Sequence, residues 1–200
     1  MNHIKQTRAD QNDLNTAIMI GALVIGWLLF DSIRNLVGLF GTPGAMTVTT
    51  RVPAQEITAS IGTGAPATID SATLVATDVN LISIICLVLT IVLRAIFLIS
   101  ATVLGVVVCR RLMRGILFDR LNSRVTFVMS ITLLAAALAP SWFENMGLNG
   151  VFAALGGEFD GQWLLLAEGA PLVVTSIALG VLVIVFRRGA TLQRDTEGLV

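Results

Sequence analysis

Four ionisable residues interrupt long apolar stretches of this sequence, and they have the clearest potential for chemistry. They are two acids and two bases: Asp31, Arg34, Arg94 and Glu168. An unpaired charge inside a lipid bilayer costs roughly 2.5 to 3.5 kcal/mol on insertion scales, so such groups are expected to face protein and to pair. Asp31 and Arg34 share a helix face at i, i+3 spacing. The four charges predict either an ion-responsive site or polar ligand pocket, or a balanced structural network that fixes helix register.

The sequence shows no other set of residues typical of catalysis or metal binding. His3 is the single histidine, and neither a nucleophile motif nor a carboxylate cluster at metal spacing is present. Cys86 and Cys109 fall in one predicted helix, roughly 35 Å apart at helical rise, and cannot pair with each other. Gly62 and Gly64 are not followed by the helix start that a phosphate-binding loop requires. We therefore expect no enzymatic activity, no cofactor and no metal.

The stretches that carry the four charges are long enough to cross a membrane. The chain has 200 residues, of which 55% are hydrophobic and 13% charged, and its mean hydropathy is +0.85. These values lie outside the range of soluble globular proteins. Predicted transmembrane helices cover residues 17–40, 80–108, 125–143 and 163–186. The expected fold is an all-α integral membrane protein with four transmembrane helices and a small extracytoplasmic β-rich insert between the first two.

The first stretch has two interpretations. Residues 17–30 form an apolar run after a basic start, which could be the core of a signal peptide. However, no small-x-small cleavage pattern follows the run, and Asp31 lies where a cleavage region would begin. We favour an uncleaved transmembrane helix.

Polar segments separate and flank these helices. They are a tail at 1–16, an insert at 41–79, a loop at 109–124, a loop at 144–162 and a tail at 187–200. Within the insert, residues 46–52 and 67–75 alternate in the manner of β-strands around a turn at 62–66. An isolated hairpin is marginal in water, so this one should pack on helix ends, on a partner or on the second outer loop. The third helix is expected to end at Pro140.

Basic residues are distributed unevenly among these segments. The loop at 109–124 and the two tails hold most of them, whereas 41–79 and 144–162 together hold Arg51 alone. Cytoplasmic segments of membrane proteins carry an excess of Lys and Arg. The sequence therefore predicts cytoplasmic N and C termini, a cytoplasmic basic loop and extracytoplasmic segments at 41–79 and 144–162.

The basic loop has more structure than a simple turn. Gly115 is expected to end the second helix, and Asp119 should lie near the N-terminus of the third. The loop and the start of the tail define a candidate surface made of Arg110, Arg111, Arg114, Phe118, Arg120, Arg124, Arg187 and Arg188. Two interpretations remain open, a linker that contacts anionic lipid headgroups and a cytoplasmic docking surface for a protein. Nucleic-acid binding is not expected.

Two segments, the inner-loop segment Arg114–Arg124 and the C-terminal segment Phe186–Val200, carry a resemblance to a known family. They resemble the bacterial membrane family called domain of unknown function 2975. The resemblance implies four helices with an outer β-rich insert, in the cytoplasmic membrane of a bacterium. It implies no activity and carries no functional residue onto Asp31 or Arg34. Such proteins are often encoded beside a small helix-turn-helix regulator, which makes the basic loop a plausible partner surface.

Together these features favour a non-enzymatic membrane protein with an accessory or regulatory role exerted through a protein partner. One alternative is an accessory subunit of a larger respiratory or transport complex. Another is a small ion-responsive transporter or channel that uses the four intramembrane charges.

Overall fold

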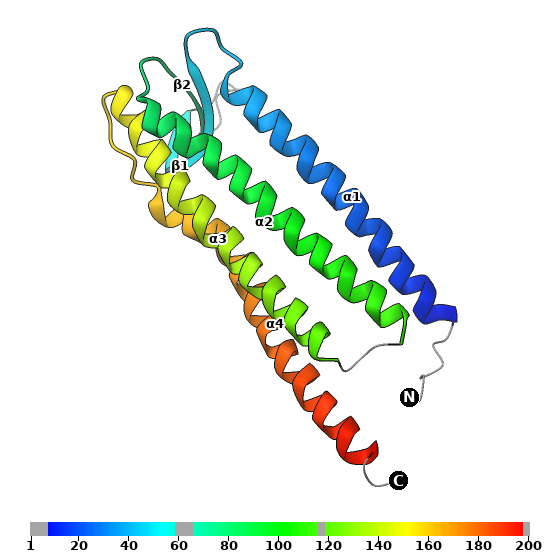
Figure 1. Cartoon of the computed structure of the whole chain (residues 1–200). Helices are drawn as coiled ribbons and strands as arrows, with labels where there is room; N and C mark the ends of the chain where they lie inside the picture. The colour runs from blue at the N-terminus through cyan, green and yellow to red at the C-terminus, as the bar shows by residue number, and fades with distance from the viewer. Residues whose placement is uncertain (1–7, 59–65, 116–118, 198–200) are drawn as a thin grey trace. The chain divides into compact units, whose positions relative to one another are not determined.

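The computed structural model describes residues 8–58, 66–115 and 119–197. These residues form four helices and one two-stranded sheet (Figure 1). The elements are α1 (Arg8–Leu39), β1 (Met46–Thr58), β2 (Pro66–Ala76), α2 (Leu81–Met113), α3 (Arg120–Ala154) and α4 (Gln162–Glu197). Each helix contains a stretch long and apolar enough to cross a membrane. The expectation of four such helices, with a small β insert after the first, is confirmed.

β1 and β2 pair as the predicted antiparallel hairpin, with Met46 opposite Ala76. Of the turn predicted at residues 62–66, only the last residue lies among the described ones. Successive side chains of a strand point to opposite faces, and here Met46, Val48 and Ala76 are buried while Thr49 and Thr73 are exposed. The two threonine hydroxyls hydrogen-bond each other at 2.9 Å. The hairpin therefore has one apolar and one polar face.

The register of the hairpin shifts once. Arg51 pairs with Ser71, whereas the next paired residue of β1, Gln55, lies opposite Ile69. Pro53 lies within this shift, and it has no N–H to donate to the ladder. A bulge at this point lets β1 continue past the proline.

Contacts divide the chain into two compact units, and each unit takes a part of every helix. The hairpin unit consists of Ser32–Leu93 and Leu138–Ala170, and it contains both strands. The loop unit consists of Met1–Asp31, Arg94–Ala137 and Pro171–Val200.

The core of the hairpin unit forms where the hairpin meets the helices. Met46 and Val48 of β1 join one buried cluster with Leu87 of α2 and with Leu148 and Val151 of α3. The last two side chains are 0% exposed. Because a two-stranded hairpin alone is marginal in water, its stability comes from this burial. The expectation that the hairpin packs on helix ends is confirmed.

α3 continues past Pro140 to Ala154, which corrects the expectation that the third helix stops there and that residues 144–162 are a loop. A proline inside a helix removes one hydrogen bond and costs about 3 kcal/mol or more, so a compensating interaction is needed. Pro140 is also fully buried, and its carbonyl accepts a hydrogen bond from the Thr90 hydroxyl of α2 at 3.3 Å. Tertiary packing therefore outweighs the local effect of the proline, and the loop is confined to the residues between α3 and α4.

α2 and α3 of the hairpin unit come into close contact at two glycines. A Cβ atom on Gly150 would lie 1.8 Å from the Ser83 hydroxyl oxygen, and one on Gly147 would lie 2.6 Å from Cγ of Leu87. Neither distance is compatible with a side chain. The two helices can approach this closely only because α3 carries glycine at these positions.

We expect Gly150→Ala to destabilise the protein, although alanine favours helix formation over glycine. Overpacking of a filled site costs about 1 to 3 kcal/mol, which exceeds the propensity gain of about 1 kcal/mol. Thermal unfolding in nanodiscs should show a lower Tm than the wild type. Gly180→Ala is the matched control, because a Cβ on this α4 glycine meets nothing nearer than 3.9 Å. An equal Tm for the two variants would contradict the packing described.

Candidate functional site

The structure distributes the four predicted intramembrane charges over both units. Asp31 and Arg94 belong to the loop unit, and each has an interaction partner. Arg34 and Glu168 belong to the hairpin unit. Arg34 is exposed, and within the described part of the chain its guanidinium forms neither an ion pair nor a hydrogen bond.

Glu168 forms an ion pair with Arg51, a partner that the sequence analysis missed. The Arg51 Nε and Glu168 Oε1 atoms lie 2.8 Å apart, and the two side chains are 56% and 36% exposed. β1 brings Arg51 to this position on the exposed face of the hairpin. Just before α4, a Cβ on Gly161 would lie 2.6 Å from the Phe159 ring and 3.3 Å from the Arg51 carbonyl oxygen, so glycine suits this position. The one available signal was that Arg51 is the single basic residue of segment 41–79.

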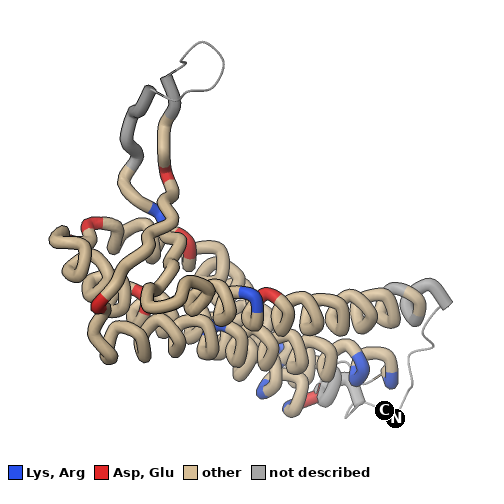
Figure 2. The backbone as a smooth tube through the Cα atoms, turned by 90° about the horizontal axis from the view of Figure 1, so that it is seen from above, with Lys and Arg blue, Asp and Glu red and all other residues tan. Residues whose placement is uncertain are grey.

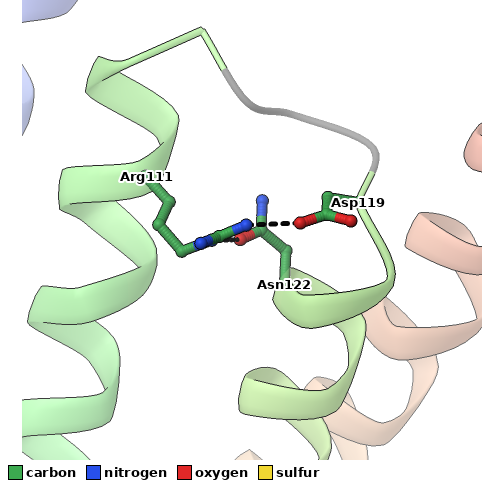
Figure 3. Close-up of polar contacts among 3 residues, drawn as sticks. All are labelled: Arg111, Asp119 and Asn122. Carbon is green, nitrogen blue, oxygen red and sulfur yellow. Dashed lines mark hydrogen bonds and ion pairs between the residues drawn. The ribbon is translucent and has the colours of Figure 1, made fainter.

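The basic connection between α2 and α3 is held by a clamp of three side chains, shown in Figure 3. The Arg111 Nε–H donates to Oδ1 of Asn122 at 2.6 Å, while its Nη2 group pairs with the Asp119 carboxylate. Arg111 is half-buried and Asn122 is 0% exposed. A planar guanidinium that contacts two acceptors at once fixes orientation as well as distance. The Arg111 clamp, defined by these three residues, therefore sets how the end of α2 meets the start of α3.

Gly115 and Asp119 mark the helix ends as expected, but both helices extend into residues 109–124, which corrects the prediction that this whole segment is a loop. α2 ends at Met113, and Gly115 adopts a left-handed φ of 73°, the conformation that favours glycine after a helix. Asp119 directly precedes α3, and its carbonyl accepts from the Ser123 N–H at 3.2 Å. Phe118 lies outside the described residues.

The clamp continues along α3 as a row of buried polar residues that meet α4 in the loop unit. Ser123 accepts a hydrogen bond from the Arg187 Nε–H at 3.3 Å. One and two turns further, Thr126 and Ser130 are also buried. Ser130 and Ser176 each donate to the other's backbone carbonyl at 2.8 Å. Interhelical hydrogen bonds between small residues are a common means of joining apolar helices.

Six of the predicted surface residues remain exposed around the clamp. They are Arg110, Arg114, Arg120, Arg124, Arg187 and Arg188. In Figure 2, basic segments of the loop unit gather at the helix ends that flank the connection. This basic surface, defined by the six arginines, suits phosphate or carboxylate groups of a lipid or a protein.

The described residues show limited potential for other chemistry. Cys86 and Cys109 are free thiols, as their spacing predicts. Among the side chains the structure describes, no three His, Cys, Asp or Glu residues gather as a metal site would require. None of three comparisons, with models of protein families, with curated proteins and with solved structures, finds a match to this chain.

We expect the Arg111 clamp to contribute more to stability than the basic residues around it. Asn122→Ala and Arg111→Gln should each lower the free energy of unfolding by about 1 to 3 kcal/mol, because each leaves a polar partner unpaired. Denaturant unfolding of the single and double variants should give a coupling energy of at least about 0.5 kcal/mol. Arg110→Gln, next in sequence and exposed, is the control. Additive effects of the two substitutions would contradict the clamp.

The ion pair between Arg51 and Glu168 should contribute little, because both side chains are exposed. We expect Arg51→Gln to change stability by less than about 1 kcal/mol, with the difference vanishing at high salt. Arg51→Glu should be the most destabilising single substitution at this pair at low salt, and Glu168→Arg should restore it. The measurement is the Tm at low and high ionic strength. A salt-independent loss would show that the Arg51 side chain acts through packing instead.

Proposed function

We propose that this chain is a multi-pass protein of a bacterial cytoplasmic membrane that acts without catalysis, as an accessory or regulatory component bound to a protein partner. The orientation proposed has both termini and the basic surface in the cytoplasm and the hairpin outside. Four candidate spans and the excess of arginine at the α2–α3 connection support this orientation. The family resemblance drawn from the sequence stays a prediction, and it is consistent with the same arrangement.

The observation that carries the proposal is the basic surface beside the Arg111 clamp. The clamp holds the ends of α2 and α3 in a fixed arrangement, and six arginines are exposed around it. Ordered charges of one sign on rigid helix ends favour recognition of acidic groups. Anionic lipid headgroups are expected to occupy part of this surface, and a protein partner the rest.

A subunit of a larger membrane complex is the second candidate. Large apolar side chains are exposed on all four helices, for example Leu23 at 73%, Ile82 at 70%, Leu138 at 49% and Val174 at 66%. Such faces can contact lipid or the helices of neighbouring subunits. Both candidate functions require a protein partner, which is a single protein in the first and a large membrane complex in the second.

Topology can be tested with single cysteines in a Cys86→Ser, Cys109→Ser background. We expect an impermeant maleimide to label Thr49→Cys, on the exposed face of the hairpin, in intact cells. Arg120→Cys, on the connection, should be labelled only after the membrane is opened. The reverse pattern would overturn the orientation and move the basic surface outside.

The role itself is tested by affinity purification from native membranes into nanodiscs at native expression level, followed by quantitative mass spectrometry. A partner recovered in constant stoichiometry would support an accessory role, and recovery within a large complex would favour the second candidate. Neutralising Arg120 and Arg124 together should reduce recovery of the partner severalfold. Recovery of this chain alone, as a homo-oligomer, would contradict both candidates.

A further inference from the structure

α1 is the least covered of the four candidate spans. Only 6% of its most apolar window is buried, compared with 22%, 33% and 17% for α2, α3 and α4. Within the loop unit, α1 lies beside α2 (Figure 1). The buried residue Gly21 faces α2, because a Cβ on it would lie 2.8 Å from Cγ2 of Val106. The opposite face is exposed. We define it as the α1 face, made of Met19, Leu23, Trp27, Phe30, Arg34 and Val37.

Two polar groups lie on the α1 face. Trp27 and Arg34 are seven residues apart and therefore share one side of the helix. Trp27 is 63% exposed and lies at the middle of the candidate span Leu14–Leu39. In the described part of the chain, neither the indole N–H nor the guanidinium has a hydrogen-bond or ion-pair partner.

This arrangement is poorly suited to contact with lipid alone. Tryptophan is enriched at the two membrane interfaces, whereas Trp27 lies at mid-span. Among the four charges predicted to lie inside the membrane, Asp31, Arg94 and Glu168 have partners. Arg34 is the exception, and an arginine inside a span is costly unless it is paired.

The same side of α1 carries two glycines with open space beside them. A Cβ on Gly26 or Gly38 would meet nothing within 4 Å, and both residues are exposed. Small residues at a helix surface let a second helix backbone approach closely. Neither glycine is needed for packing inside this chain, unlike Gly21.

We propose that the α1 face binds a transmembrane helix of a second protein, and that a carboxylate of this helix pairs with Arg34. The inference rests on the proposed function and assigns the partner to a particular surface. A second copy of this chain is disfavoured, because a symmetric contact through the α1 face would bring the two Arg34 side chains together. The nearest carboxylate on α1, Asp31, already has a partner within the chain. A carboxylate at the same depth removes the cost of the unpaired guanidinium. Lipid phosphate, reached by extending the Arg34 side chain toward the membrane surface, is the competing outcome.

Photo-crosslinking in native membranes tests this assignment. A photoreactive amino acid replaces Leu23 on the α1 face, and in the control chain it replaces Val181, 57% exposed on α4. We expect a discrete protein adduct from position 23 and none from position 181. Arg34→Lys should retain the adduct, whereas Arg34→Gln and Arg34→Glu should reduce it at least fivefold at equal membrane levels.

Reciprocal charge exchange makes the test decisive. Once the crosslinked segment is identified, its acidic residue is changed to lysine, which should restore the adduct with Arg34→Glu and abolish it with the wild-type chain. The inference would be overturned by an adduct with lipid alone or with a second copy of this chain. It would also be overturned by a protein adduct whose yield does not change with the charge at position 34. A partner that crosslinks from position 120 or 124 but not from 23 would overturn it while leaving the proposed function intact.

Discussion

Arg111 joins the end of α2 to the start of α3 through two polar contacts. Its guanidinium contacts the Asp119 carboxylate and the buried Asn122 amide, and a planar group with two fixed acceptors leaves little freedom of register. Once the start of α3 is fixed against α2, the buried row that begins at Ser123 faces α4. The contacts from Arg187 to Ser123 and between Ser130 and Ser176 then follow. These polar contacts determine which faces of the loop-unit helices meet.

Small residues have the complementary role in the hairpin unit. Gly147 and Gly150 let α3 approach α2 so closely that Leu87 and Ser83 occupy the space of the missing side chains. The apolar face of the hairpin then covers the same helix ends, and Leu148 and Val151 become fully buried. The loop unit thus shows hydrogen bonds between its helices, and the hairpin unit shows close helix packing at glycines. All four helices are hydrophobic, so these local contacts determine which helix faces pack together.

The sequence predicted the elements of this fold better than it predicted their contacts. Hydropathy located four helices, β-type alternation located the hairpin, and Gly115 and Asp119 marked the helix ends, because each signal is local. Pro140 gave a wrong prediction of the helix end, because its local effect is overcome by its burial and by the hydrogen bond from Thr90. The pairing of Glu168 with Arg51 joins residues far apart in the chain, and no spacing rule connects a strand to a distant helix. Nothing in the composition of α1 showed that one side would remain uncovered.

The register shift at Pro53 has a consequence for how far the hairpin can grow. A two-stranded sheet has two free edges, and each could pair with a strand of another molecule. A proline and a bulge on an edge strand both disfavour pairing with a further strand, and β1 has both at Pro53. Self-association through the β1 edge is thereby disfavoured. We therefore expect the hairpin to stay two-stranded and not to extend into a larger sheet.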